Sequence, residues 1–256
     1  MKNPIVICGY GPGISQAVAR RFGAAGHPVA IIARNAERLE AGAEALRKEG
    51  VTAKSFPADL TDSDARANAF ADIRASLGPV GILHWNAFLP VNGDLLTSPV
   101  EDLRQSLELR LVSFIAAVQA LFDDLKASGG TILATSGITA LDRPEINKFA
   151  VDYAVMAITV AAQHKALGIL VPTLASHGIH VAEVVINGFV KGTEGVGAFD
   201  QTGTIDPKDV AACFWDMFEN RTQNSRIFGA DIIAEEALRR NPQAHGGDYL
   251  RGAAEP

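Results

Sequence analysis

The chain has 256 residues and a mass of 27.0 kDa, of which 48% are hydrophobic and 20% are charged. This composition supports a sizeable core and argues against disorder, and the length is common for a single α/β domain. The formal net charge of −6, the lack of a basic block and the absence of a membrane-length or signal-type apolar run predict a cytoplasmic protein without nucleic-acid or membrane partners.

The first predicted element is an apolar strand, Ile5–Cys8, which enters a glycine-rich turn and is followed by a helical pattern over residues 16–22. This order suits a dinucleotide-binding turn, because glycines let the backbone approach a pyrophosphate and the helix directs its free N–H groups at the phosphates. Ser15 stands where a third glycine is usual, and we expect its small side chain to be tolerated. A βα turn that is merely rich in glycine is the alternative. The expected cofactor contacts in this turn are Gly9, Gly11, Pro12, Gly13 and Ile14.

Strand-type and helical segments alternate along the rest of the chain. The predicted strands are Val29–Ala33, 51–56, 80–85, 131–135, 179–186 and a short edge strand at 226–228. The predicted helices are Ala36–Lys48, Ser63–Leu77, a long one within 101–126, 147–170 and one from Pro207 to Phe218. Pro172 is expected to end or kink the helix before it.

Strands that are apolar on both faces and separated by helices indicate a parallel sheet that is covered on both sides. We therefore expect one Rossmann-type α/β domain over residues 1–256, a three-layer αβα arrangement with a doubly wound parallel sheet of about seven strands. The tail from about Ala244 is expected to be loosely held. Cys8 and Cys213 have no metal-binding spacing, and no metal site is predicted.

Ligands bind beyond the carboxyl ends of the strands in such sheets. The second predicted strand ends in Ala33-Arg34, where proteins that bind NAD usually carry an acid for the ribose 2′-hydroxyl. The missing acid and the planar cation of Arg34 favour NADP(H), because a guanidinium suits a 2′-phosphate. A solvated arginine at a helix start is the alternative.

Several further motifs follow in order. Asp59-Leu60 comes after the third predicted strand and Asn86-Ala87-Phe88 after the fourth, while Asn187-Gly188-Phe189-Val190 comes after the sixth. With the glycine turn, these motifs make the chain resemble the short-chain dehydrogenase/reductase family over nearly its full length. Phe88 and Asn187 depart from the family's usual glycine and proline. The resemblance implies that the cofactor is contacted by Asp59, Leu60, Asn86, Ala87, Phe88, Asn187, Gly188 and Val190.

The resemblance also implies a serine after the fifth strand, an asparagine on the preceding helix and a Tyr-x-x-x-Lys pair on the following one. Ser136 fits the serine position, and Arg110 stands at the asparagine position. Tyr153 is the tyrosine on the expected helix, but Ala157 and not lysine stands four residues later. No register yields Tyr-x-x-x-Lys.

Two counts of the register disagree, which indicates an insertion. Counting from Ser136 puts Phe149 and Tyr153 at the tyrosine and lysine positions, whereas counting back from His177-Gly178 puts Met156 and Val160 there. The candidate catalytic residues are Ser136, Tyr153 and Arg110. Their alternatives are a cap for the serine, a core or interface role for the tyrosine and a surface or subunit-contact charge for the arginine. His164 is expected to be a polar position near the helix end.

Residues 191–203 form a glycine-rich segment that we expect to cover the substrate. Trp85, Phe88, Phe189 and Phe199 would make the pocket apolar and aromatic. The helical pattern from Phe149 to Leu170 is apolar on most faces. The resemblance implies that two long helices form a subunit interface, so we expect a homodimer or homotetramer.

The leading hypothesis is an NADP(H)-dependent oxidoreductase that transfers hydride to or from a carbonyl or alcohol of a small, fairly apolar substrate. One alternative is a non-catalytic NADP(H)-binding sensor or scaffold that has lost the Tyr/Lys pair. Another is an enzyme that uses other groups, Arg110 among them.

Overall fold

The computed structural model describes residues 2–193 and 204–229. Seven strands form one sheet in the order β3-β2-β1-β4-β5-β6-β7, and every neighbouring pair is parallel. The strands are β1 Ile5–Cys8, β2 Val29–Ala33, β3 Ala53–Pro57, β4 Ile82–Trp85, β5 Thr131–Gly137, β6 His180–Ile186 and β7 Ser225–Phe228. The predicted doubly wound parallel sheet is confirmed. The strand order reverses between β1 and β4, which is the position where such sheets bind ligands.

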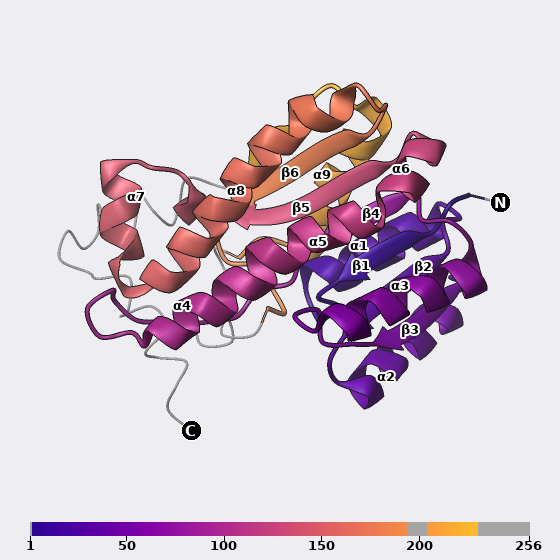
Figure 1. Cartoon of the computed structure of the whole chain (residues 1–256), viewed down its shortest axis with the longest axis horizontal. Helices are drawn as coiled ribbons and strands as arrows, with labels where there is room; N and C mark the ends of the chain where they lie inside the picture. The colour runs from indigo at the N-terminus through magenta and orange to yellow at the C-terminus, as the bar shows by residue number, and fades with distance from the viewer. Residues whose placement is uncertain (1, 194–203, 230–256) are drawn as a thin grey trace.

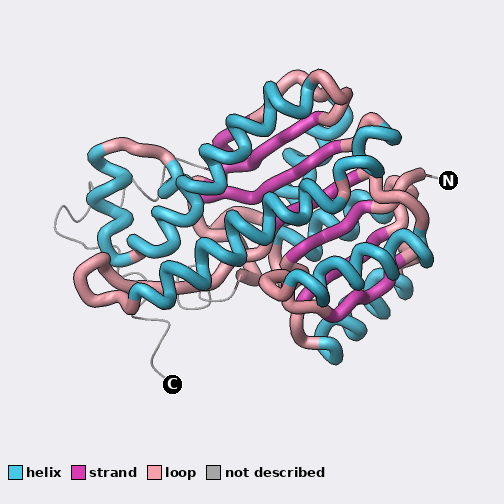
Figure 2. Tube along the Cα trace, in the orientation of Figure 1, coloured by secondary structure: helices cyan, strands magenta, loops and turns pink. Residues whose placement is uncertain are grey.

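Helices cover both faces of the sheet, as Figures 1 and 2 show. The helices are α1 Ile14–Ala24, α2 Ala36–Lys48, α3 Ser63–Leu77, α4 Val100–Leu107, α5 Ser113–Ala120, α6 Phe122–Ser128, α7 Pro144–Phe149, α8 Ala154–Ala175 and α9 Pro207–Asn220. Side chains of α1, α2 and α9 pack into the core on one face, and those of α3, α5, α6 and α8 pack into the core on the other. The core strands are fully buried because both of their faces meet helices.

The long helix predicted within 101–126 is present but not uniform. A π-helical turn, Glu108–Val112, joins α4 to α5, and the chain bends by 57° where α6 follows. π-turns add a residue to a helical turn and are frequent at functional sites. Arg110 is the buried residue of this turn.

The helix predicted over 147–170 is two helices. A short 3₁₀ turn, Ala150–Asp152, separates α7 from α8, because the backbone of Gly93 bonds here: its N–H donates to the Asp152 carbonyl and its carbonyl accepts from Ala154. Pro172 does not end the helix, since α8 continues to Ala175. The proline lacks the N–H that would bond to the carbonyl of Gly168, and the helix continues for three residues beyond it.

Among the described helices, α8 is long and apolar enough to cross a membrane by length and composition, and the bent α4–α6 segment passes the same test if taken as one span. Core helices of globular proteins also pass it. Since α8 packs against β5 and β6, its apolar composition is accounted for in part by the core.

Candidate functional site

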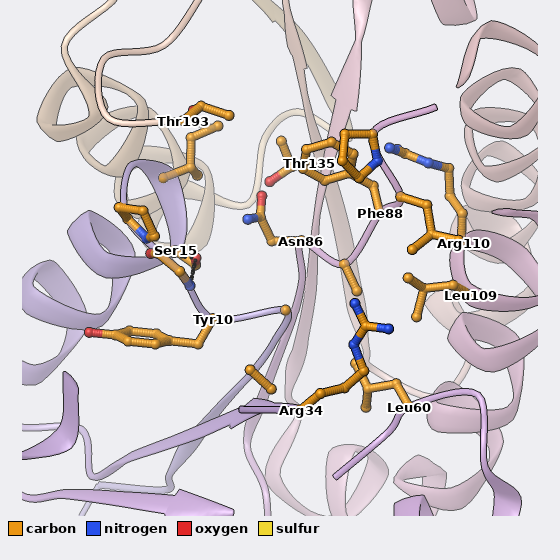
Figure 3. A pocket seen from close by; sticks show the side chains of 18 of the residues that line it. Tyr10, Ser15, Arg34, Leu60, Asn86, Phe88, Leu109, Arg110, Thr135 and Thr193 are labelled. Atoms are coloured by element: carbon orange, nitrogen blue, oxygen red, sulfur yellow. Dashed lines mark hydrogen bonds between the residues drawn. The ribbon is translucent and has the colours of Figure 1, made fainter. Parts of the chain in front are cut away.

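A cleft of about 1560 Å³ opens at the carboxyl ends of the strands (Figure 3). It is lined from the glycine turn after β1 to the segments that follow β2, β3, β4, β5 and β6. The predicted site residues on its wall are Gly9, Gly11, Pro12, Ile14, Arg34, Asp59, Leu60, Asn86, Ala87, Phe88, Arg110, Ser136, Gly188 and Val190. Gly13, Asn187 and Tyr153 do not line it.

The glycine turn is shaped by its backbone. Gly9 has φ +82°, and a Cβ there would lie 2.5 Å from the Ala87 Cα, so no other residue fits without moving the loop after β4. Gly13 is the N-cap of α1, with φ +87° and no side-chain cap. The first-turn N–H groups of α1 thus have no capping side chain, which suits an anionic ligand.

Ser15 replaces the third glycine without loss of packing. Its side chain is buried, and its Oγ accepts a hydrogen bond from the Gly11 N–H at 3.0 Å and donates to the Gly11 carbonyl at 3.2 Å. Serine therefore ties the turn to the start of α1. The sequence predicted tolerance but not these bonds.

Arg34 follows β2 and reaches into the cleft (Figure 3). Asp59, on the same part of the wall, accepts hydrogen bonds from the Thr61 N–H at 2.9 Å and the Thr61 hydroxyl at 2.8 Å. Burial raises the pKa of Asp59, but these bonds and the charge of Arg34 outweigh it and leave the pKa below its ordinary value. A fixed carboxylate and a guanidinium thus share this end of the cleft.

Ser136 lies inside β5, one position before its end, and is almost fully buried at the cleft wall. Its hydroxyl donates to the carboxylate of Glu183 on β6, which is 2% exposed. The other Glu183 oxygen lies 2.7 Å from His164 Nδ1 on α8 and accepts from the Ser225 hydroxyl at 3.2 Å. A connected polar network therefore runs from the cleft to His164, whose side chain is 34% exposed.

Sequence reasoning missed Glu183 and set His164 aside. A lone carboxylate in the otherwise apolar strand 180–186 was the available signal, because a buried acid requires partners. Which partners it had could not be read from the sequence, since β5, β6 and α8 meet only in the fold.

The two counts of the register name different side chains, and they differ in what reaches the cleft. Met156 and Val160, from the count back from His177-Gly178, line it, whereas Phe149 and Tyr153 do not. Tyr153 is 5% exposed, lies just before α8 and packs against Phe149 with ring centroids 5.6 Å apart. The structure therefore does not bring Tyr153 to the cleft, and the α8 side chains that line it are apolar.

Arg110 is the buried member of the π-helical turn and lines the cleft. Its guanidinium lies 5.3 Å from the centroid of the Phe88 ring, a cation–π distance. Burial lowers its pKa to about 10. The arginine is thus a charged group of the cleft wall and not a surface charge.

The aromatic lining differs from the predicted one. Trp85 is fully buried, packs against Phe114 at 5.6 Å and does not line the cleft. Phe88 and Phe189 do line it. Phe199, most of the predicted covering segment 191–203 and the tail from Ala244 fall outside the described residues. Within the residues described, no group of three or more His, Cys, Asp or Glu side chains could hold a metal ion.

Comparison with known proteins agrees with the resemblance that the sequence motifs carry. The family model described as short chain dehydrogenase matches residues 3–193. The chain is 40% identical to 2,3-dihydro-2,3-dihydroxybenzoate dehydrogenase of Bacillus subtilis over 77 residues, 30% of either chain. It is 31% identical to a fatty acyl-CoA reductase of Acinetobacter baylyi over 139 residues, 53% of this chain and 47% of that one. The matches thus span less than half of the length of these two relatives.

Solved structures with this fold include proteins bound to NADP. A short chain dehydrogenase from Burkholderia cenocepacia in complex with NADP is 25% identical, with a TM-score of 0.78 over 89% of this chain and 96% of that one. An L-sorbose reductase from Gluconobacter frateurii, complexed with NADPH and L-sorbose, is 18% identical. The two structures match with a TM-score of 0.80 over 91% of this chain and 97% of the reductase.

Proposed function

The chain belongs to the short-chain dehydrogenase family, and on this basis we propose that it is an NADP(H)-dependent oxidoreductase acting on a carbonyl or alcohol of a small substrate. The observation that carries the proposal is the continuity of one cleft, which joins the glycine turn and Arg34 to Ser136. A cofactor held at the first two would place its reacting end toward the third, because the strands of the sheet order these groups along one edge.

The residues present fit such a cofactor. The uncapped first turn of α1 would hold the diphosphate, since its N–H donors and dipole favour negative charge. Arg34 would hold a ribose 2′-phosphate, and the lack of an acid at the end of β2 favours NADP(H) over NAD(H). When bound, the nicotinamide supplies or accepts the hydride.

Ser136 and the network behind it would handle the proton. In alcohol oxidation, the substrate hydroxyl gives its proton to the Ser136 Oγ while the Ser136 proton passes to the Glu183 carboxylate, and carbonyl reduction reverses both transfers. His164 holds Glu183 from the solvent side at 2.7 Å. Ser136 is the catalytic residue in this scheme, and Glu183 and His164 act through it.

A non-catalytic NADP(H)-binding protein is the second candidate. Met156 and Val160 favour it, because neither side chain can donate or accept a proton at the positions where the family carries tyrosine and lysine.

We also propose a homodimer or homotetramer. The outer faces of the π-helical turn and α8 carry exposed apolar side chains, with Val112 51%, Ile158 39% and Ile169 56% exposed. These two elements contact one another and lie side by side in Figure 1, so they form one surface. A role as core and interface helix for α8 also accords with the cytoplasmic location that we propose.

The first test is titration with NADPH and NADH, followed by energy transfer from tryptophan to the reduced nicotinamide. Trp85 directly precedes the cleft residues Asn86 and Ala87, which makes it a suitable donor. We expect NADPH to bind more tightly than NADH and Arg34→Ala to remove the preference, with a loss of about tenfold or more for NADPH. Arg20→Ala is the matched control, since Arg20 pairs with Glu49 outside the cleft.

The outcomes separate the candidates. Binding of neither nucleotide would refute both. NADPH binding without turnover of any carbonyl in a broad panel of aldehydes and ketones would favour the non-catalytic protein. NADPH binding with turnover that falls in Ser136→Ala would support the oxidoreductase.

A further inference from the structure

Among the arginines that the structure describes, Arg110 alone is buried. It is 8% exposed, and the π-helical turn directs it into the cleft beside Phe88 (Figure 3). The other arginine of this helical region, Arg104, also lines the cleft but is exposed. Stacking on the Phe88 ring fixes the direction of the Arg110 guanidinium without neutralising its charge.

No acid balances this charge within the described part of the chain. Neither an ion pair nor a hydrogen bond to the Arg110 guanidinium is formed there, and the Nε atom is buried without a partner. Glu108 lines the cleft only two residues away, but side chains two apart on a helix point in different directions. An arginine that keeps its charge at neutral pH thus has a buried Nε without a partner, and the rest of its guanidinium is unpaired at the cleft wall.

A buried, unpaired charge is costly, and protein sites normally offset it with an opposite charge. The free donors of Arg110 form a planar fork that matches the two oxygens of a carboxylate or the oxygens of a phosphate. Arg34 lies at the β2 end of the cleft, so the two guanidinium groups approach it from separate elements (Figure 3). The proposed function assigns Arg34 to the cofactor and gives Arg110, the buried arginine of the cleft wall, no ligand.

We propose that Arg110, stacked on Phe88, binds an oxyanion group of the substrate, a carboxylate or a phosphate. The inference rests on the proposed function, since it assigns the substrate class for the same cleft. The cleft lining holds apolar side chains, Leu89, Met156 and Val160 among them, together with polar ones such as Glu108. The substrate class is accordingly an apolar chain or ring that carries an oxyanion and a reducible carbonyl or an oxidisable hydroxyl.

The test uses three probes of equal chain length: octanoate, octyl phosphate and the neutral octanamide. Each is titrated by isothermal calorimetry into the protein saturated with NADP⁺ and, separately, into the cofactor-free protein. We expect at least one anion to bind about tenfold or more tightly than octanamide, equivalent to about 1.4 kcal/mol. Which of the two anions binds better distinguishes a carboxylate substrate from a phosphate substrate.

Arg110→Met is expected to remove the preference for the anion while leaving octanamide within about twofold, since methionine keeps apolar bulk and loses the charge. Arg110→Lys keeps the charge and should retain part of the preference, which guards against a folding defect in the methionine variant. Arg104→Met is the matched control and should change none of the three affinities by more than about twofold, because its charge is already in water.

Two results would overturn the proposal. One is equal binding of octanamide and both anions by the wild-type protein. The other is a loss of NADP⁺ affinity in Arg110→Met with unchanged probe affinities, which would assign Arg110 to the cofactor. Failure of the proposed function itself is a different result, the absence of NADP(H) binding by the wild-type protein, and the cofactor-free titrations still decide whether Arg110 holds an anion.

Discussion

His84 is expected to make the protein less stable at moderately low pH. The side chain is fully buried in β4, its ring meets Phe214 edge-on at 5.0 Å, and its Nδ1 atom has no hydrogen-bond partner among the described residues. Its Nε2 atom is 3.4 Å from the Thr135 hydroxyl. Burial lowers the pKa of His84 from 6.5 to about 3, because the protonated ring would be an unpaired charge in the core.

The sign and size of this change in stability follow from the linkage between proton binding and folding. Between pH 6.5 and about 3 the unfolded chain binds a proton at His84 and the folded protein does not, so the free energy of unfolding falls as the pH falls. The slope from this group is about 1.4 kcal/mol per pH unit at most. From pH 8 to pH 4.5 the loss amounts to about 2.7 kcal/mol, a large part of the stability of an ordinary domain.

The assay is urea unfolding followed by tryptophan fluorescence at pH 8 and pH 4.5, for the wild type and His84→Leu. Carboxyl groups also titrate in this interval, and the variant retains all of them, so they cancel in the comparison. The loss of unfolding free energy on acidification should be smaller by about 2.7 kcal/mol in His84→Leu, whatever its stability at pH 8. Equal losses in the two proteins would refute the reasoning.

Three further predictions concern the cleft and the outer face. Gly9→Ala should abolish nucleotide binding and lower the unfolding free energy by about 1–3 kcal/mol, because its Cβ would overlap the loop after β4; intact NADPH binding in the fluorescence titration would contradict this. Glu183→Gln should lower kcat by about 100-fold, while the affinity for NADPH stays within about twofold. The control variant Ser225→Ala should keep a kcat near that of the wild type. An unchanged kcat in Glu183→Gln would mean that the network has only a structural role. Ile169→Asp should shift the protein toward monomers in sedimentation velocity, and a monomeric wild type would remove the basis for this expectation.

The fold could be predicted because each strand carries its own signal. Runs such as Val29–Ala33 are apolar on both faces, and only a sheet with helices on both sides buries them completely. The glycine turn could also be predicted, because its backbone conformation requires glycine. Gly9 and Gly13 adopt positive φ values that other residues rarely take. Arg34 and the strand-end motifs reached the cleft for the same reason: parallel strands end at one edge.

The interruption before α8 could not be predicted, because it depends on a partner far away in sequence. The backbone of Gly93 forms hydrogen bonds with Asp152 and Ala154, on both sides of Tyr153. The sequence around residue 153 carries no pattern that predicts this contact. This interruption shifts the register, so that Met156 and not Tyr153 faces the cleft. The π-helical turn that carries Arg110 is likewise a feature of the backbone, and its consequence, a buried arginine at the cleft wall, appears only with the fold.

The apolar cleft face of α8 and the buried Glu183 are physically connected. Val160 lines the cleft, and His164 lies one turn further along the same face of α8 but does not line it. Glu183 links His164 to the cleft, since it bonds Ser136 on one side and His164 on the other. In the mechanism that we propose, the substrate oxygen would meet Ser136 and not a tyrosine, and the proton would pass toward solvent along Glu183 and His164. Under this proposal, the route through β6 would let the cleft move a proton although the α8 side chains that line it, Met156 and Val160, are apolar.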